Sequence, residues 1–283
     1  MSARWLVVIL TAAAFVATPL LISAQPAAPS AISAPELARR IQQSGDIGWS
    51  GFVETAGRLQ VPDSDSFATL VQLLGENTRL RVWWRNADDW RVDRIRSTGE
   101  TGLFRQGGST IRWVFESETA TYSPVSQIRL PDSSDLLPST FARSLLQGVR
   151  ENELSRLPAR RVAGIDAPGL RLTPQEPAAT VAHVDIWADS GSGLPLRVEV
   201  YGGEQRPVLT TTVRELSLGA PPATATDFTP PKAYTSTTSS PLMSPRLRTR
   251  SRLTISLPPL PAWNREMVKT PAPSAFMGGA QLP

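Results

Sequence analysis

The chain contains few side chains that could perform acid–base or nucleophilic chemistry. Its single histidine, His183, could act as the base for a serine nucleophile, but no serine lies in a G-x-S-x-G motif. The absence of cysteine excludes a thiol nucleophile, thiolate metal ligands and disulfides. One histidine is also too few for a zinc site of the usual kind. We therefore expect no enzyme, and we interpret His183 as an exposed strand residue.

The acidic residues and glycines also favour structural roles. The pairs Asp88–Asp89 and Asp63 with Asp65 lie in predicted turns, where aspartate suits the backbone geometry. Gly191-Ser192-Gly193 is a hairpin turn rather than a phosphate-binding loop, because no helix follows it. We expect no cofactor and no metal.

The clearest structural signal lies between residues 180 and 203. Apolar and polar residues alternate there on both sides of the turn that contains Gly191 and Gly193. This pattern predicts a β-hairpin with one apolar face and one polar face. The apolar residues are Val184, Ile186, Ala188, Leu196, Val198 and Val200.

Similar patterns elsewhere predict an α+β domain over residues 34–231. Strands are expected at 49–61, 78–85, 90–95, 102–105, 110–116, 121–123, 160–172, 181–188, 194–201 and 207–218. Helices are expected at 34–43 and 136–149. So long an antiparallel sheet must curve, and the two helices are the only candidates to cover its apolar face. Two short helices are few for that surface, which leaves room for an apolar cavity.

The cavity is predicted from large apolar residues on strands and on the second helix. Such residues line ligand pockets, although they also fill ordinary cores, and the sequence leaves both alternatives open. The nine candidates are Val82, Trp84, Trp90, Ile111, Trp113, Phe115, Leu137, Phe141 and Leu145.

Both ends of the chain differ in composition from the domain. Residues 1–24 predict a signal peptide or an uncleaved N-terminal anchor, and residues 25–33 a spacer. The tail, residues 232–283, has seven Lys or Arg and one acid, a net charge of +6 against +4 for the whole chain, which leaves −2 for residues 1–231. The domain is thus unlike a nucleic-acid-binding protein. For the tail, disorder, contact with an anionic membrane surface and a shifted reading frame stay open.

Three stretches in this order resemble a known family. They are WSGFVET (residues 49–55), LRVWWRNADDWRVDRI (80–95) and residues 160–231, which include DIWADSGSGLPLRVEVYGG and end in DFTPP. They resemble the LolA-like group, which includes the outer-membrane lipoprotein carrier, the N-terminal domain of RseB/MucB and actinobacterial secreted relatives. The resemblance implies an incomplete, strongly curved antiparallel β-barrel, with the helices as a lid over a hydrophobic cavity, and no catalytic activity.

The sequence and the resemblance together predict an exported protein that is secreted, periplasmic or anchored by its N-terminal segment. The first hypothesis is a monomeric binder or carrier of a lipid, an acyl chain or a lipidated protein. The alternative is an RseB-like regulator that binds the extracytoplasmic domain of an anti-sigma factor at the membrane. We expect no nucleic-acid partner.

Overall fold

The computed structural model describes residues 26–58, 77–124, 131–176, 179–232 and 234–238. The predicted signal segment and Asp63 with Asp65 lie outside these residues, as does the tail beyond Thr238. Among the described helices, none has the length and apolar character needed to span a membrane.

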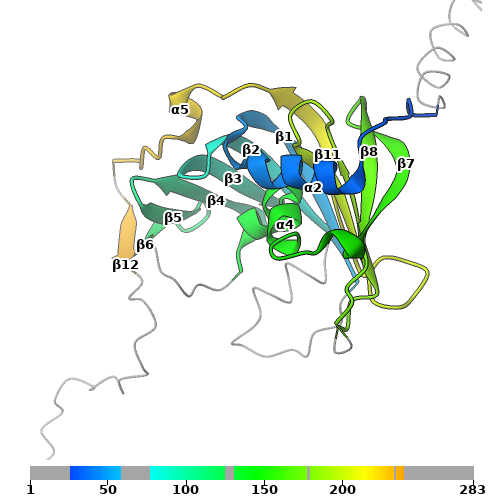
Figure 1. Cartoon of the computed structure of the whole chain (residues 1–283). Coiled ribbons are helices and arrows are strands. Elements are labelled where there is room, and N and C mark those ends of the chain that lie inside the picture. Colours follow the sequence, from blue (N-terminus) through cyan, green and yellow to red (C-terminus); the bar gives the residue numbers. More distant parts are fainter. Residues whose placement is uncertain (1–25, 59–76, 125–130, 177–178, 233, 239–283) are drawn as a thin grey trace, which may run out of the picture. The chain divides into compact units, whose positions relative to one another are not determined.

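The described residues form a single sheet of twelve strands, ordered β12-β6-β5-β4-β3-β2-β1-β11-β10-β9-β8-β7. Every neighbouring pair is antiparallel except β12 and β6, which run parallel. The strands are β1 (Trp49–Gly57), β2 (Asn77–Asn86), β3 (Asp89–Arg96), β4 (Gly99–Gln106), β5 (Ser109–Val114), β6 (Thr119–Pro124), β7 (Leu154–Val162), β8 (Ile165–Leu172), β9 (His183–Ala188), β10 (Pro195–Tyr201), β11 (Leu209–Leu218) and β12 (Thr235–Thr238). The predicted fold class is confirmed: a large open sheet with few helices (Figure 1).

The helical segments are short. They are α2 (Ala34–Gln43), η1 (Ser44–Asp46), η2 (Ser133–Leu136), α4 (Pro138–Leu145), η3 (Glu151–Glu153) and α5 (Ala223–Thr226). The first predicted helix is confirmed, with the Ser33 hydroxyl accepting a hydrogen bond from the Glu36 amide at 3.3 Å.

The second predicted helix, 136–149, is too long. Leu137 has an extended backbone, with ψ of 136°, because a residue that precedes proline avoids the helical conformation. Helix α4 therefore begins at Pro138, and it ends at Leu145, shortly before Gly148 with φ of +72°.

The two faces of the sheet follow from its register, because cross-strand partners point to the same side. Val82 pairs with Val92, and Val92 with Leu103; on the other half of the sheet, Val198 pairs with Ile186. These residues share one face, which α2 covers near β7 and β8 and α4 covers near β10 and β11 (Figure 1). We call it the helix-side face and its opposite the outer face.

Secondary structure that is attached to the sheet continues beyond residue 231, the predicted boundary of the domain. After β11, helix α5 contacts β2 and β3, and β12 then pairs with β6, with Thr235 opposite Thr119. We call residues 223–232 and 234–238 the strap.

Candidate functional site

The helices and the β8–β11 half of the sheet form one apolar cluster. Leu37 and Ile41 of α2 and Ala142 of α4 pack against Leu170 and Ile186 of the sheet, and all five are buried. Complete burial of such side chains stabilises a fold by about 1.5–3 kcal/mol each. This part of the helix-side face is therefore a filled core.

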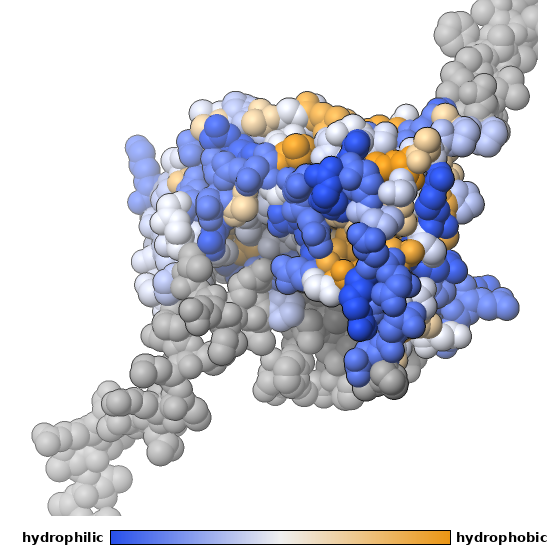
Figure 2. Space-filling view, viewed as in Figure 1, coloured by the Kyte–Doolittle hydropathy of each residue, from blue (hydrophilic) through white to orange (hydrophobic). Residues whose placement is uncertain are grey.

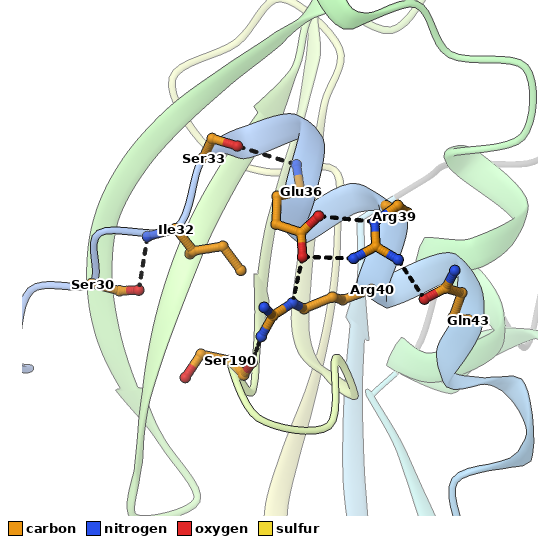
Figure 3. A network of polar contacts seen from close by, with 8 residues as sticks. All are labelled: Ser30, Ile32, Ser33, Glu36, Arg39, Arg40, Gln43 and Ser190. Atoms are coloured by element: carbon orange, nitrogen blue, oxygen red, sulfur yellow. Dashed lines mark hydrogen bonds and ion pairs between the residues drawn. The ribbon is translucent and has the colours of Figure 1, made fainter.

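Charged side chains fix α2 over the β9–β10 hairpin. Glu36 accepts hydrogen bonds from Arg39 Nε at 2.8 Å and Arg40 Nε at 2.8 Å, which lower its pKa to about 2 (Figure 3). Arg40 Nη1 also donates to the Ser190 carbonyl oxygen at 2.6 Å. In the same hairpin, a Cβ on Gly193 would lie 2.5 Å from the Arg40 carbonyl oxygen, and Gly193 has φ of +76°. Only glycine allows this close approach without strain.

Four of the nine predicted cavity residues belong to a second packed cluster on the helix-side face. Trp84 and Trp90 stack in parallel with 5.6 Å between ring centroids, and Trp84 Nε1 donates to the Gly45 carbonyl oxygen at 3.0 Å. Val82 and Leu137 are fully buried in the same cluster. The protein's own side chains therefore occupy the space around these four residues.

A buried hydroxyl attaches the chain before α4 to the sheet. Thr211 Oγ1 donates to the Leu136 carbonyl oxygen at 2.6 Å and lies 3.3 Å from Thr55 Oγ1. Both threonines are almost inaccessible to water. This attachment holds Leu136 and Leu137 against the sheet.

Three other predicted residues lie on the opposite side of the sheet. Ile111 pairs with Phe104 and Phe104 with Arg91, so Ile111 and Trp113 point to the outer face, away from Val82. Phe115 is 41% exposed and meets Trp113 edge-on at 6.0 Å. The nine residues therefore do not form one cavity lining, and that expectation is corrected.

The placement of these residues could not be predicted because the pattern within one strand does not identify its side of the sheet. Alternation shows which residues of one strand share a side, but the register across each turn decides which side that is.

The last two predicted residues, Phe141 and Leu145, lie on α4, half-buried against the helix-side core. Leu145 also borders a groove of about 500 Å³ at the end of α4. The groove lies within the size range of small-molecule sites. Its lining combines apolar and polar residues: Leu145, Gln147, Gly148, Val149, Arg150, Glu153, Leu172 and Pro174. Apart from Leu145, the apolar spacing did not indicate these residues, because they lie beyond the end of α4 or at the end of β8.

One wall of the groove is held by a buried carboxylate. Glu153 accepts hydrogen bonds from the backbone amides of Arg150 at 2.9 Å and Gln175 at 3.0 Å and from Arg150 Nη2 at 3.4 Å. These donors lower the pKa of Glu153 to about 2. Glu153 is thus an anion at neutral pH and connects η3 to the chain after β8.

The remaining surface near α2 and α4 is mixed. Figure 2 shows mostly hydrophilic side chains on this side, with apolar surface in separate patches between them. The groove, whose lining also combines apolar and polar residues, has the same mixed character.

The outer face of β8–β10 carries ion pairs and hydrogen-bonded polar side chains. Arg171 forms two hydrogen bonds with Asp185, at 2.7 and 2.8 Å, and Tyr201 donates to Glu199 at 2.8 Å. His183 stacks on Tyr201 at 4.3 Å, and burial together with Arg171 lowers the pKa of His183. Within the described ranges, no group of three or more His, Cys, Asp or Glu side chains could hold a metal ion.

No protein-family model matches the chain, and no curated protein does. Among solved structures it is similar to an uncharacterized conserved protein from Thermus thermophilus, with TM-score 0.45 and 13% identity over 73% of this chain and 99% of that one. The MucA/MucB complex of Pseudomonas aeruginosa gives TM-score 0.44 and 17% identity over 67% of this chain and 58% of that one. The LolA superfamily protein NE2245 from Nitrosomonas europaea gives TM-score 0.29 and 16% identity over 70% of this chain and 99% of that one.

Proposed function

We propose that this chain is an exported, non-enzymatic binder of a hydrophobic ligand in the cell envelope. The observation that carries the proposal is the groove at the end of α4, where Leu145, Val149, Leu172 and Pro174 supply apolar walls. The N-terminal sequence, with its single charge at Arg4 before a long apolar run, supports export.

The groove offers apolar area without requiring the core to open. Leu145 and Val149 are only partly buried, so an acyl chain in contact with them would remove further apolar surface from water. Each buried methylene contributes about 0.8 kcal/mol, so eight would contribute about 6 kcal/mol before the cost of ordering the ligand. The polar residues at the rim, Arg150 and Gln147, would stay beside the head of the ligand.

A displacement titration tests this proposal. The protein is saturated with a hydrophobic fluorescent dye, and a C16 fatty acid is added. We expect Leu145→Arg to lower the affinity for dye and fatty acid at least ten-fold, because a charge would stand among the apolar walls. Leu137 is unsuitable for this test because it is completely buried.

The matched control is Leu218→Arg, the same substitution at a half-exposed leucine at the end of β11, outside the groove. Equal affinities in the wild type and Leu145→Arg would overturn the assignment of the ligand to the groove. Native mass spectrometry adds a second readout, since co-purified lipid supports the binder, whereas an empty protein that binds an anti-sigma segment supports the regulator.

A further inference from the structure

The outer face carries a second apolar surface, which the chain covers with its own strap. Phe228 inserts between Phe104, Trp113 and Tyr122, with ring-centroid distances of 5.1, 5.7 and 6.4 Å. Phe104, Ile111 and Trp113 are buried in this arrangement. Without Phe228, an aromatic patch would face water on the side of the sheet opposite to α2 and α4.

Side-chain hydrogen bonds hold both ends of the strap, in addition to the contacts of α5 with β2 and β3 and the pairing of β12 with β6. Gln106 binds its first part: Nε2 donates to the Thr226 carbonyl oxygen at 3.0 Å and to Asp227 at 3.1 Å, and Oε1 accepts from the Phe228 amide at 3.3 Å. The Tyr122 and Tyr234 hydroxyls, 3.3 Å apart, join its last part to β6.

The strap is poorly buried. All four residues of β12 are exposed, and Tyr234 is 37% exposed. Segments with few buried contacts and exposed backbone hydrogen bonds open at low free-energy cost. Opening of the strap would uncover both the aromatic patch and the backbone edge of β6. An uncovered edge beside an apolar patch is the arrangement to which extended peptides bind by adding a strand.

We propose that the outer aromatic patch and the edge of β6 form a second docking site, for an extended peptide of another protein, which the strap fills in the isolated chain. The seated strap defines the chemistry of this partner: an aromatic side chain for the Phe228 position, a tyrosine six residues later and a polar strand parallel to β6. Strap and peptide would compete for one surface. The site lies on the outer face, so it is independent of the groove beside α4.

A fluorescent peptide with the sequence TDFTPPKAYTSTT, residues 226–238, tests the site by anisotropy on the full chain. In the wild type, the peptide can bind only those molecules whose strap is open. Its apparent affinity is therefore the intrinsic affinity multiplied by the fraction of open molecules. We expect Phe228→Ala to raise the affinity at least ten-fold, since it removes the main anchor of the strap and leaves the groove intact. Tyr234→Ala, at an exposed position that does not threaten folding, should raise it about three-fold by the same competition.

The control is Leu218→Ala, which removes a half-exposed leucine at the end of β11, outside the outer aromatic cluster and the strap. Its peptide affinity should equal that of the wild type. A peptide with alanine in place of its phenylalanine should not bind any of the variants. The proposal is overturned if neither strap variant gains affinity, if the alanine peptide binds equally well, or if the strap variants dimerise instead of binding peptide.

Discussion

The helix-side face over β8–β11 and the outer face of β4–β6 are both apolar, but they are covered in different ways. The first is covered by two helices, and a network of charged residues fixes α2 above the hairpin of β9 and β10. The second is covered by Phe228 and Tyr234, which belong to a segment that ends in an exposed four-residue strand. The contrast shows that a buried apolar residue indicates a permanent core only when its cover is also well anchored.

The two faces also differ in whether a ligand can reach them from the side. The helix-side cover ends in a groove beside Leu145, where a ligand can approach without displacing a helix. The outer patch becomes available only if the strap leaves. Binding on the helix-side face should therefore need little rearrangement, whereas binding on the outer face should depend on how often the strap opens.

The largest expected effect on stability comes from shortening a buried isoleucine on each of the two faces. Ile186→Ala, in the helix-side core, should lower the free energy of unfolding by about 4 kcal/mol, because the cavity would be enclosed on all sides. Ile111→Ala, in the small outer cluster, should cost about 2 kcal/mol, because a thinly covered site can relax. Urea titration measures both. An outer substitution as costly as the core one would remove the difference between the two faces.

A smaller effect is expected where the hairpin approaches α2. Gly193→Ala should cost about 2–3 kcal/mol, because an alanine there is strained at positive φ and its Cβ meets the Arg40 backbone. Gly164→Ala is the matched control, with φ of +81° but nothing within 4 Å of its Cβ, and should cost about 1 kcal/mol. Thermal unfolding of both variants measures the difference. Equal losses would show that α2 is not held by this contact.

The smallest expected effect is the dependence of stability on Glu153, a residue of the groove wall, at acidic pH. The pKa of Glu153 is about 2 in the folded protein against an ordinary value of 4.5, so its contribution to stability is complete above about pH 4.5. That contribution is lost as the pH falls from 4.5 towards 2. Glu153→Gln should therefore show a flatter loss of stability than the wild type in this window, and Glu151→Gln, at an exposed neighbour, should follow the wild type. Identical profiles for the wild type and Glu153→Gln would contradict the role of this carboxylate.

Strand patterning predicted most of the sheet because period-two alternation depends on local sequence. The hairpin of β9 and β10 and helix α2 are observed where the pattern indicated them. The candidate site was harder to predict. Ile111 and Trp113 have the same spacing as Val82 and Trp84 and similar residue types, and only the register of β4 and β5 places them on the outer face. The bounds of α4, and with them the groove, depend on the backbone at Leu137 before the helix and at Gly148 after it rather than on apolar spacing.

Photo-crosslinking with a fatty acid that carries a diazirine near its methyl end tests the central claim most directly. The probe is bound to the full wild-type chain and illuminated, and the labelled peptides are mapped by mass spectrometry. The account predicts labels on residues 145–153 and 172–174, the walls of the groove beside α4. Labels confined to the outer cluster around Trp113 and Phe228, or no specific label at all, would contradict it.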